Sequence, residues 1–255
     1  MKIVIIGAGK VGSALGRALH TQGNTILKIV SRSGEKAAAL ASELECEYGN
    51  ELLMPMDSEM VILAVNDDAL YDVLGKLKAP PDTVIAHTAG SVDLGVFGSE
   101  ISNHGVFYPL QTFTHGRKYD FTSIPLFIEA NNDYSEKRLK SLALSLSKKV
   151  FCLDSDKRKY IHLAAVFSCN FVNHLYGAGE EITACAGMDF KVLLPLLKET
   201  MDKASEMGPE KSQTGPAVRN DKITIEKHLE LLSFSPDLQK IYRVITDSII
   251  KKYTG

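Results

Sequence analysis

The sequence begins with an apolar run that leads directly into closely spaced glycines, and this feature most constrains the fold. Residues 3–6 are consecutive β-branched residues, too few for a helix and typical of a buried parallel strand. Gly7, Gly9 and Gly12 follow in the spacing G-x-G-x-x-G, and residues 13–22 place apolar side chains on one helical face. A strand, a glycine turn and a helix in this order predict a site for the pyrophosphate of a dinucleotide.

The composition is that of an ordinary globular protein. Of the 255 residues, 45% are hydrophobic, and the formal net charge of −2 gives no electrostatic attraction to nucleic acid or to an anionic membrane. No apolar stretch is long enough to span a bilayer. The four cysteines lack the spacing of metal ligands, so we expect reduced thiols, no metal site and a cytoplasmic location.

Strand-like and helix-like segments alternate up to about residue 153, which predicts an α/β fold. The further predicted strands cover residues 26–30, 60–65, 83–86, 124–130 and 150–153. The apolar segment 105–113 is interrupted by Pro109, so we expect an edge strand or an extended segment beside a substrate.

The pattern changes after residue 154, where no convincing strand follows. Residues 156–186 predict one long helix, with further helices behind it. We therefore expect a Rossmann-type, doubly wound and mainly parallel sheet in residues 1–154 that binds the cofactor. An all-α domain for substrate binding and dimerisation would follow in residues 155–255.

The end of the second predicted strand indicates which dinucleotide binds. An acidic residue that bonds the ribose 2′-hydroxyl is usual here in NAD-binding folds, but this chain has Ser31, Arg32 and Ser33 and no acid before Glu35. A guanidinium can hold a 2′-phosphate through two hydrogen bonds, and serine hydroxyls can add more. We interpret this turn as an NADP site, although a solvated turn would also fit the residues.

Two other segments carry polar groups that can face a substrate. The loop at residues 87–91, which ends in Ser91, follows a strand, and either holds a substrate against backbone N–H groups or only caps the next helix. On the long helix, His162, Asn170 and Asn173 lie on one face among small apolar residues. Buried polar side chains need partners, so this face is either a pocket wall or a set of satisfied core residues.

Several motifs together resemble the 6-phosphogluconate-dehydrogenase-like superfamily. They are GAGKVG at 7–12, LAVNDD at 63–68, HTAGS at 87–91, YPLQTF at 108–113 and GPAVRND at 215–221, ahead of or within a helical second half. They are most similar to an uncharacterised bacterial branch usually labelled NADP oxidoreductase. The superfamily also includes pyrroline-5-carboxylate reductase, ketopantoate reductase and deazaflavin-dependent NADP oxidoreductases.

The resemblance implies roles for individual residues. Lys10 and Val11 join Gly7, Gly9 and Gly12 in the pyrophosphate loop, and Ser31, Arg32 and Ser33 match the adenosine phosphate site. The other matched positions are Ala64, Val65 and Asn66 beside the nicotinamide ribose, Ser91 in the substrate loop, and Asn170 and Asn173 on the helix that supplies catalytic groups in relatives. It also implies a homodimer.

The proton carrier departs from the pattern of the relatives. β-Hydroxyacid dehydrogenases have a lysine four residues before an asparagine on the long helix, where this chain has Val166 before Asn170. Tyr108 stands where many members of the branch have histidine. Tyr108, His162 or His87 could carry the proton instead, and the reduction of an imine or of a deazaflavin would need less from the protein.

The sequence therefore predicts an NADP-dependent oxidoreductase that transfers a hydride between nicotinamide and a small substrate. The substrate would be a carbonyl compound, an imine or a deazaflavin bound between the two domains. The missing lysine leaves one alternative open, a non-catalytic protein that binds NADP as a sensor.

Overall fold

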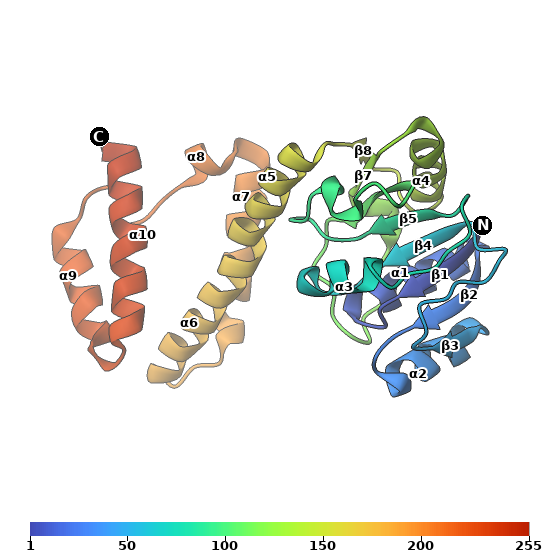
Figure 1. Cartoon of the computed structure of the whole chain (residues 1–255). Helices are drawn as coiled ribbons and strands as arrows, with labels where there is room; N and C mark the ends of the chain where they lie inside the picture. Colours follow the sequence, from blue (N-terminus) through green and yellow to red (C-terminus); the bar gives the residue numbers. More distant parts are fainter. Residues whose placement is uncertain (255) are drawn as a thin grey trace. The chain divides into compact units, whose positions relative to one another are not determined.

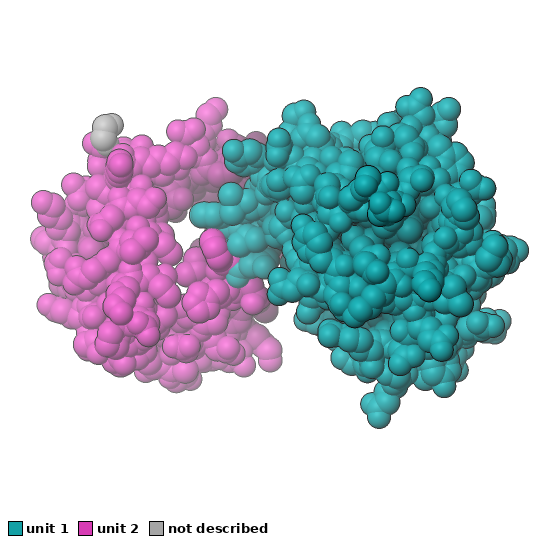
Figure 2. Space-filling view, in the orientation of Figure 1, with its two compact units in different colours: residues 1–170 teal, residues 171–255 magenta. Residues whose placement is uncertain are grey.

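The computed structural model describes residues 1–254, which form two compact units (Figure 2). The first unit covers residues 1–170, and the second begins at residue 171. The predicted domain boundary lies where Asp154 caps a helix, by accepting a hydrogen bond from the amide of Lys157. That helix groups with the first unit by its contacts. The assignment of separate roles to residues 1–154 and 155–255 stays a prediction.

The first unit is built on one sheet with the order β3-β2-β1-β4-β5-β6-β7-β8 (Figure 1). The strands are β1 (Lys2–Ile6), β2 (Thr25–Val30), β3 (Glu47–Gly49), β4 (Met60–Leu63), β5 (Val84–His87), β6 (His104–Pro109), β7 (Leu126–Ala130) and β8 (Val150–Cys152). Neighbouring strands are parallel except for β6 and β7. The strand order reverses between β1 and β4, and the carboxyl ends of strands at such a switch point are where doubly wound folds bind ligands.

Helices cover both faces of the sheet because successive side chains of a strand point in opposite directions. Ile3 and Ile5 are buried in one apolar cluster with residues of α1, α2 and α4, whereas Val4 and Ile6 are buried in a second cluster with Leu70 of α3. The helices are α1 (Lys10–Thr21), α2 (Gly34–Leu44), α3 (Leu70–Leu74) and α4 (Asp133–Leu146). The predicted doubly wound α/β fold is confirmed.

The prediction of an edge strand around residue 105 was wrong. β6 lies inside the sheet between β5 and β7, and all six of its residues are buried. Pro109 was the reason for that prediction, because a proline has no N–H group to donate to a neighbouring strand. It is tolerated because it is the last residue of β6, opposite Leu126 at the start of β7.

The predicted long helix contains a π-helical segment. α5 (Ser155–Ala165) is followed by the π-helix Val166–Phe171 and then by α6 (Val172–Cys185). A π-helical turn holds more residues than an α-helical turn, so it changes which side chains share a face. The α-helical spacing that placed Asn173 on the face of His162 therefore does not hold across this segment.

The second unit consists of helices with very few buried side chains. Its remaining helices are α7 (Leu194–Met207), α8 (Pro209–Ser212), α9 (Lys222–Leu231) and α10 (Pro236–Thr254). Among its described residues, those classed as buried are Ala217, Leu229, Leu232 and Thr246. The helical region expected after the sheet is confirmed, and its apolar faces are mostly open.

Candidate functional site

The glycine loop between β1 and α1 has a backbone that a phosphate group can approach. Gly7 has a φ of 112°, and a Cβ atom there would collide with the carbonyl group of Ala64. A Cβ atom on Gly12 would meet the Gly7 carbonyl, so this glycine lets α1 pack against the loop. Gly9 is the N-cap of α1, and a Cβ atom there would have no neighbour within 4 Å. A ligand beside Gly9 therefore has access to the free N–H groups of the first turn.

A cavity of about 360 Å³ opens beside this loop, at the carboxyl ends of β1, β2 and β4. Eight residues predicted to bind the cofactor line it: Gly7, Gly9, Ser31, Arg32, Ser33, Ala64, Val65 and Asn66. The other three do not: Lys10 is exposed at the start of α1, Gly12 packs on the loop, and Val11 lines a second cavity. The open glycine backbone and the position at the switch point fit a dinucleotide.

Two cations line this cavity near the end of β2. Arg32 and Lys36 are both exposed, and neither forms an ion pair within residues 1–254. Arg32 was predicted from the sequence, but Lys36 was not; it lies in the first turn of α2 behind the N-cap, Ser33. Lys36 could have been found from its position, because it lies four residues after Arg32 at the start of a helix. Two unpaired cations beside two serines suit a phosphate on the adenosine ribose.

A second cavity of about 360 Å³ is lined by three of the five residues predicted to act on the substrate. Tyr108 at the end of β6, His162 on α5 and Asn170 in the π-helix all line it. Val11 of the glycine motif also lines it, and so does Thr88 after β5. Since Val11 lies in the first turn of α1, the second cavity reaches the same loop that borders the first.

Tyr108 and His162 form a hydrogen-bonded pair in this second cavity. The Tyr108 hydroxyl lies 3.1 Å from His162 Nδ1, and the two ring centroids are 6.0 Å apart in an edge-on arrangement. Gly90 packs tightly against the pair. A Cβ atom on Gly90 would lie 2.7 Å from His162 Nδ1 and 2.7 Å from Tyr108 Cζ. Glycine at this position therefore lets the loop after β5 close over the pair.

The surroundings of Tyr108 keep its hydroxyl protonated at neutral pH. Burial raises the pKa of Tyr108, and the positive charge of Arg158 opposes part of that rise. A protonated phenol donates a hydrogen bond and can give up a proton to a substrate atom that gains negative charge.

Ser91 and Asn173 are not among the residues that line the second cavity. The Ser91 hydroxyl donates a hydrogen bond of 2.5 Å to Asp67, and neither residue lines the second cavity. Asp67 directly follows Asn66, so Ser91 is tied to the end of β4 near the first cavity. Asn173 is an exposed residue of α6, in the second unit. Roles for both residues in catalysis stay predictions.

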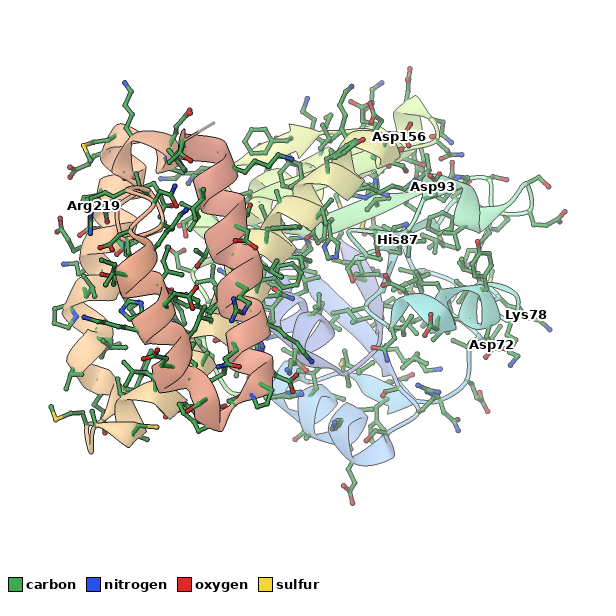
Figure 3. All side chains as sticks on the ribbon, turned by 90° about the vertical axis from the view of Figure 1, so that its left-hand side faces the viewer. Asp72, Lys78, His87, Asp93, Asp156 and Arg219 are labelled. Atoms are coloured by element: carbon green, nitrogen blue, oxygen red, sulfur yellow. The ribbon has the colours of Figure 1, made fainter. Side chains whose placement is uncertain are left out.

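His87 lies in the interior of the first unit (Figure 3) and lines neither cavity. Its imidazole is fully buried and stacks on Phe97, and its Nδ1 accepts a hydrogen bond from the amide of Ala89 at 3.2 Å. Burial, helped by the positive charge of Arg158, lowers the pKa of His87 to about 4. A neutral, enclosed imidazole is a poor proton carrier for a substrate, which leaves Tyr108 and His162 as the candidates.

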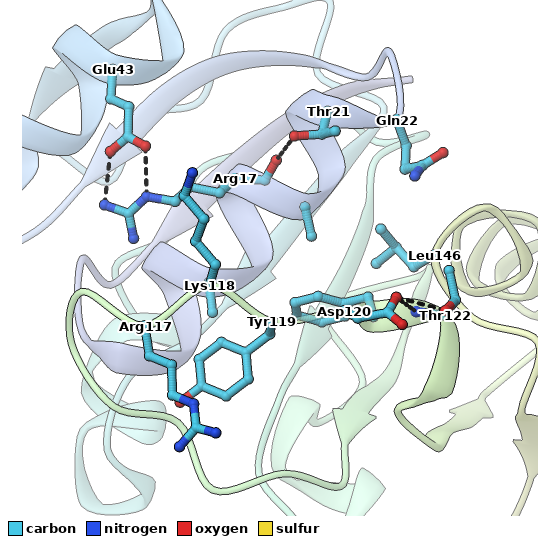
Figure 4. A pocket seen from close by; sticks show the side chains of 13 residues that line it. Arg17, Thr21, Gln22, Glu43, Arg117, Lys118, Tyr119, Asp120, Thr122 and Leu146 are labelled. Atoms are coloured by element: carbon cyan, nitrogen blue, oxygen red, sulfur yellow. Dashed lines mark hydrogen bonds and ion pairs between the residues drawn. The ribbon is translucent and has the colours of Figure 1, made fainter.

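A third hollow, of about 390 Å³, lies along α1 toward its C-terminal end (Figure 4). Arg17 and Glu43 form a two-pronged ion pair there, with both N–O distances at 2.7 Å. Arg117 lies over the ring of Tyr119 instead of meeting an acid. Thr21 and Gln22 place this hollow toward the opposite end of α1 from the glycine loop, so it does not belong to the dinucleotide site.

Residues 1–254 contain no cluster of three or more histidine, cysteine, aspartate or glutamate side chains that could hold a metal ion. Within the same residues, no helix has both the length and the apolar character needed to cross a bilayer.

Comparisons with protein families match both parts of the chain. A family described as NADP oxidoreductase coenzyme F420-dependent matches residues 2–90. A domain of unknown function, DUF2520, matches residues 124–249. No curated protein shows significant similarity to the chain.

Solved structures match the whole length of the chain. A Bacteroides fragilis protein described as an NADP oxidoreductase is 38% identical, with a TM-score of 0.91 over 98% of both chains. A Thermotoga maritima protein is 25% identical, with a TM-score of 0.72 over 98% of this chain and 97% of that one. A reductive aminase from Aspergillus terreus in complex with NADPH shares the fold at 13% identity, with a TM-score of 0.72 over 98% and 94%.

The resemblance seen in the sequence motifs is thus confirmed over the full chain. Both the Bacteroides fragilis relative and the family that matches residues 2–90 are described as NADP oxidoreductases. The chain belongs to the family of NADP oxidoreductases that combine this Rossmann-type domain with the DUF2520 domain.

Proposed function

We propose that this oxidoreductase uses NADPH to reduce the C=O or C=N bond of a small molecule bound beside Tyr108 and His162. The observation that carries the proposal is the 3.1 Å hydrogen bond between these two side chains in a cavity that Val11 also lines. A proton-donating pair therefore stands next to the loop that holds the dinucleotide. Reduction of a carbonyl or imine needs one hydride and one proton, and the pair can supply the proton.

The first cavity would hold the cofactor through groups already in place. Backbone N–H groups behind Gly9 would hold the pyrophosphate, and Arg32 and Lys36 would hold the phosphate on the adenosine ribose. Ala64, Val65 and Asn66 line the side of the cavity toward β4. When bound, NADPH supplies the hydride.

In the second cavity, the lining side chains would position the substrate, and Tyr108 would donate the proton. With the proton of His162 on Nδ1, the imidazole donates to the Tyr108 oxygen, so that the hydroxyl is free to donate to the substrate. As the substrate carbon accepts the hydride, its oxygen or nitrogen takes the Tyr108 proton, and His162 stabilises the phenolate that remains. The side chains of Thr88, Gln111 and Asn170 are neutral hydrogen-bonding groups in the same cavity, which suit a carbonyl or imine.

Turnover of a substrate panel tests this function. Purified protein is mixed with NADPH and a set of ketones, aldehydes and imines, and the loss of NADPH absorbance is followed. Tyr108→Phe removes the donated proton and keeps the ring, so we expect kcat to fall by about 100-fold with an unchanged Kd for NADPH. His162→Gln should lower kcat similarly. Wild-type turnover in both variants would show that the pair does not supply the proton.

A deazaflavin is a second candidate substrate, favoured by the family that matches residues 2–90. Its reduction would be seen as loss of the absorbance of the oxidised deazaflavin in step with loss of NADPH. Turnover of the deazaflavin with no turnover of the panel would replace the first proposal.

A second copy of the chain would cover the helices of the second unit. Leu194, Leu196 and Met201 on α7 are 50%, 62% and 67% exposed, and no residue of α6 or α7 is buried. Large apolar patches on a soluble protein mark interaction sites, and symmetric dimers are the commonest assemblies. A homodimer is therefore expected. A monomeric mass in light scattering at micromolar concentration would contradict it.

The cysteines fit a reducing compartment, and we place the protein in the cytoplasm. Cys46, Cys152, Cys169 and Cys185 are all free thiols. Localisation of a fluorescent fusion of the full chain would test this placement.

A further inference from the structure

A buried arginine connects three segments of the first unit. Arg158 on α5 is fully buried. Its guanidinium forms an ion pair with Glu129 on β7 and donates to the carbonyl of Val92, in the loop after β5. It also donates to the Ser155 hydroxyl in the first turn of α5, at 3.2 Å. One cation therefore links a strand, a helix and a loop.

Ser155 reinforces the same three-way link. Its amide and hydroxyl donate to the Glu129 carboxylate at 2.9 and 2.8 Å, and its hydroxyl accepts a hydrogen bond from the amide of Leu94 at 2.9 Å. The start of α5 is thereby held against β7 and against the loop. We call Glu129, Ser155, Arg158 and the Val92 carbonyl the buried clamp.

Both of the segments that the clamp joins to β7 also reach the Tyr108–His162 pair. On α5, His162 lies four residues after Arg158, one turn further along the same face. On the loop, Gly90 lies two residues before Val92 and packs so closely on the pair that it leaves no room for a Cβ atom. Movement of either segment would change the 3.1 Å contact between Tyr108 and His162.

We propose that Arg158 is a positioning residue that, through the buried clamp, holds His162 in hydrogen-bonding contact with Tyr108. The proposal rests on the proposed function, in which this pair supplies the proton. Arg158 does not line either cavity, so it acts through the pair and does not touch the substrate.

A simple stabilising role is the competing explanation, and a paired substitution separates the two. Removing Arg158 alone leaves the Glu129 carboxylate, whose side chain is 14% exposed, without its partner and can unfold the protein. Replacing both charges, in Arg158→Met with Glu129→Leu, removes the clamp without leaving a charge behind, and such exchanges often preserve stability. We expect a melting temperature and a Kd for NADPH near those of the wild type, with kcat lower by about 10- to 100-fold.

A neighbouring surface ion pair provides the matched control. Lys159, the next residue on α5, pairs with Asp93 of the same loop at 2.8 Å, but both side chains are about half exposed. An exposed pair restrains its segments only weakly. Lys159→Met should therefore change kcat by less than about twofold.

A double-mutant cycle tests whether Arg158 acts through His162. In a His162→Gln background the paired substitution should lower kcat by less than about twofold further, because the contact that it protects is already lost. A folded paired variant with wild-type kcat, or losses that simply multiply, would overturn the proposal.

A spectroscopic readout keeps the test independent of turnover. The ring nitrogens of ¹⁵N-histidine-labelled protein are recorded, and His162 is assigned from the His162→Gln variant. The clamp predicts that the paired substitution shifts the His162 signals while Lys159→Met does not. Shifted signals with no turnover in the wild type would support the positioning role and contradict only the proposed function; unshifted signals would overturn the positioning role.

Discussion

The two units of this oxidoreductase differ in how much of their apolar surface they bury themselves. In the first unit, strands β1, β4 and β6 are buried almost throughout, and two apolar clusters fill both faces of the sheet. In the second unit, α6 and α7 have no buried residue. A region with its own core can hold a cofactor site rigidly, whereas the helical region depends on other surfaces for burial.

A leucine-to-alanine substitution should lower the free energy of unfolding most in the first unit. Leu15 on α1 is fully buried in the apolar cluster that also contains Ile3 and Ile5. Leu15→Ala should lower the free energy of unfolding by about 2–5 kcal/mol, through lost burial and the cavity left behind. Denaturant unfolding checks this value. A loss below about 1 kcal/mol would mean that the core of the first unit is less tightly packed than the burial of its side chains indicates.

The buried His87 should make the first unit sensitive to acid. Because its pKa in the folded protein is about 4, the unfolded chain binds a proton that the folded one does not between about pH 6.5 and pH 4. This contribution to stability is present above pH 6.5 and is lost as the pH falls, by about 3 kcal/mol in total.

His87→Asn keeps an acceptor for the Ala89 amide and removes the titrating ring. Its stability, measured by denaturant unfolding at several pH values, should fall less steeply below pH 6.5 than that of the wild type. Equal slopes for the two proteins would contradict the prediction.

Cofactor specificity should depend on the first unit alone. Arg32→Ala should weaken NADPH binding by about 1–3 kcal/mol, because a charge-assisted contact to the 2′-phosphate is lost. NADH lacks that phosphate and should bind almost unchanged. Fluorescence titration measures both Kd values, and Lys36→Ala should act in the same direction. Equal losses for the two nucleotides would show that these side chains do not recognise the phosphate.

The smallest effect on subunit stability is expected in the second unit. Leu196 on α7 is 62% exposed, so Leu196→Ala should change the free energy of subunit unfolding by less than about 0.5 kcal/mol. If a second copy covers α7, the cost appears instead as weaker association, which light scattering over a dilution series would detect. If Leu196→Ala lowered the free energy of unfolding of a monomer as much as Leu15→Ala does, the two units would not differ in how tightly their apolar side chains are packed.

Local patterns in the sequence identified most of the residues that line the first cavity. Strand, turn and helix are continuous in the glycine motif, so Gly7, Gly9 and the serines around Arg32 could be placed without knowing what packs beside them. Lys36 was missed because it follows the end of the strand by a full helical turn, inside α2. The strand β3 was missed as well, since its three residues carry no alternating apolar pattern.

The second cavity was harder to predict because its parts are far apart in the chain. Tyr108 and His162 are 54 residues apart, and only the sheet and α5 bring them within hydrogen-bonding distance. The π-helix also changed the expected face, so Asn170 lines the cavity and Asn173 does not. An α-helical spacing rule cannot foresee such a wider turn.

By itself, the sequence determined the class of fold, the glycine loop and Arg32 at the end of β2, because these depend on residues that are neighbours along the chain. Only the tertiary structure decided that β6 lies inside the sheet, that Tyr108 meets His162, and that Arg158 is buried against Glu129. Those contacts depend on which surfaces pack together, and burial then sets the pKa values and the exposure of the side chains. A glycine motif can therefore be identified from its spacing in the sequence, whereas the Tyr108–His162 contact is evident only in the tertiary structure.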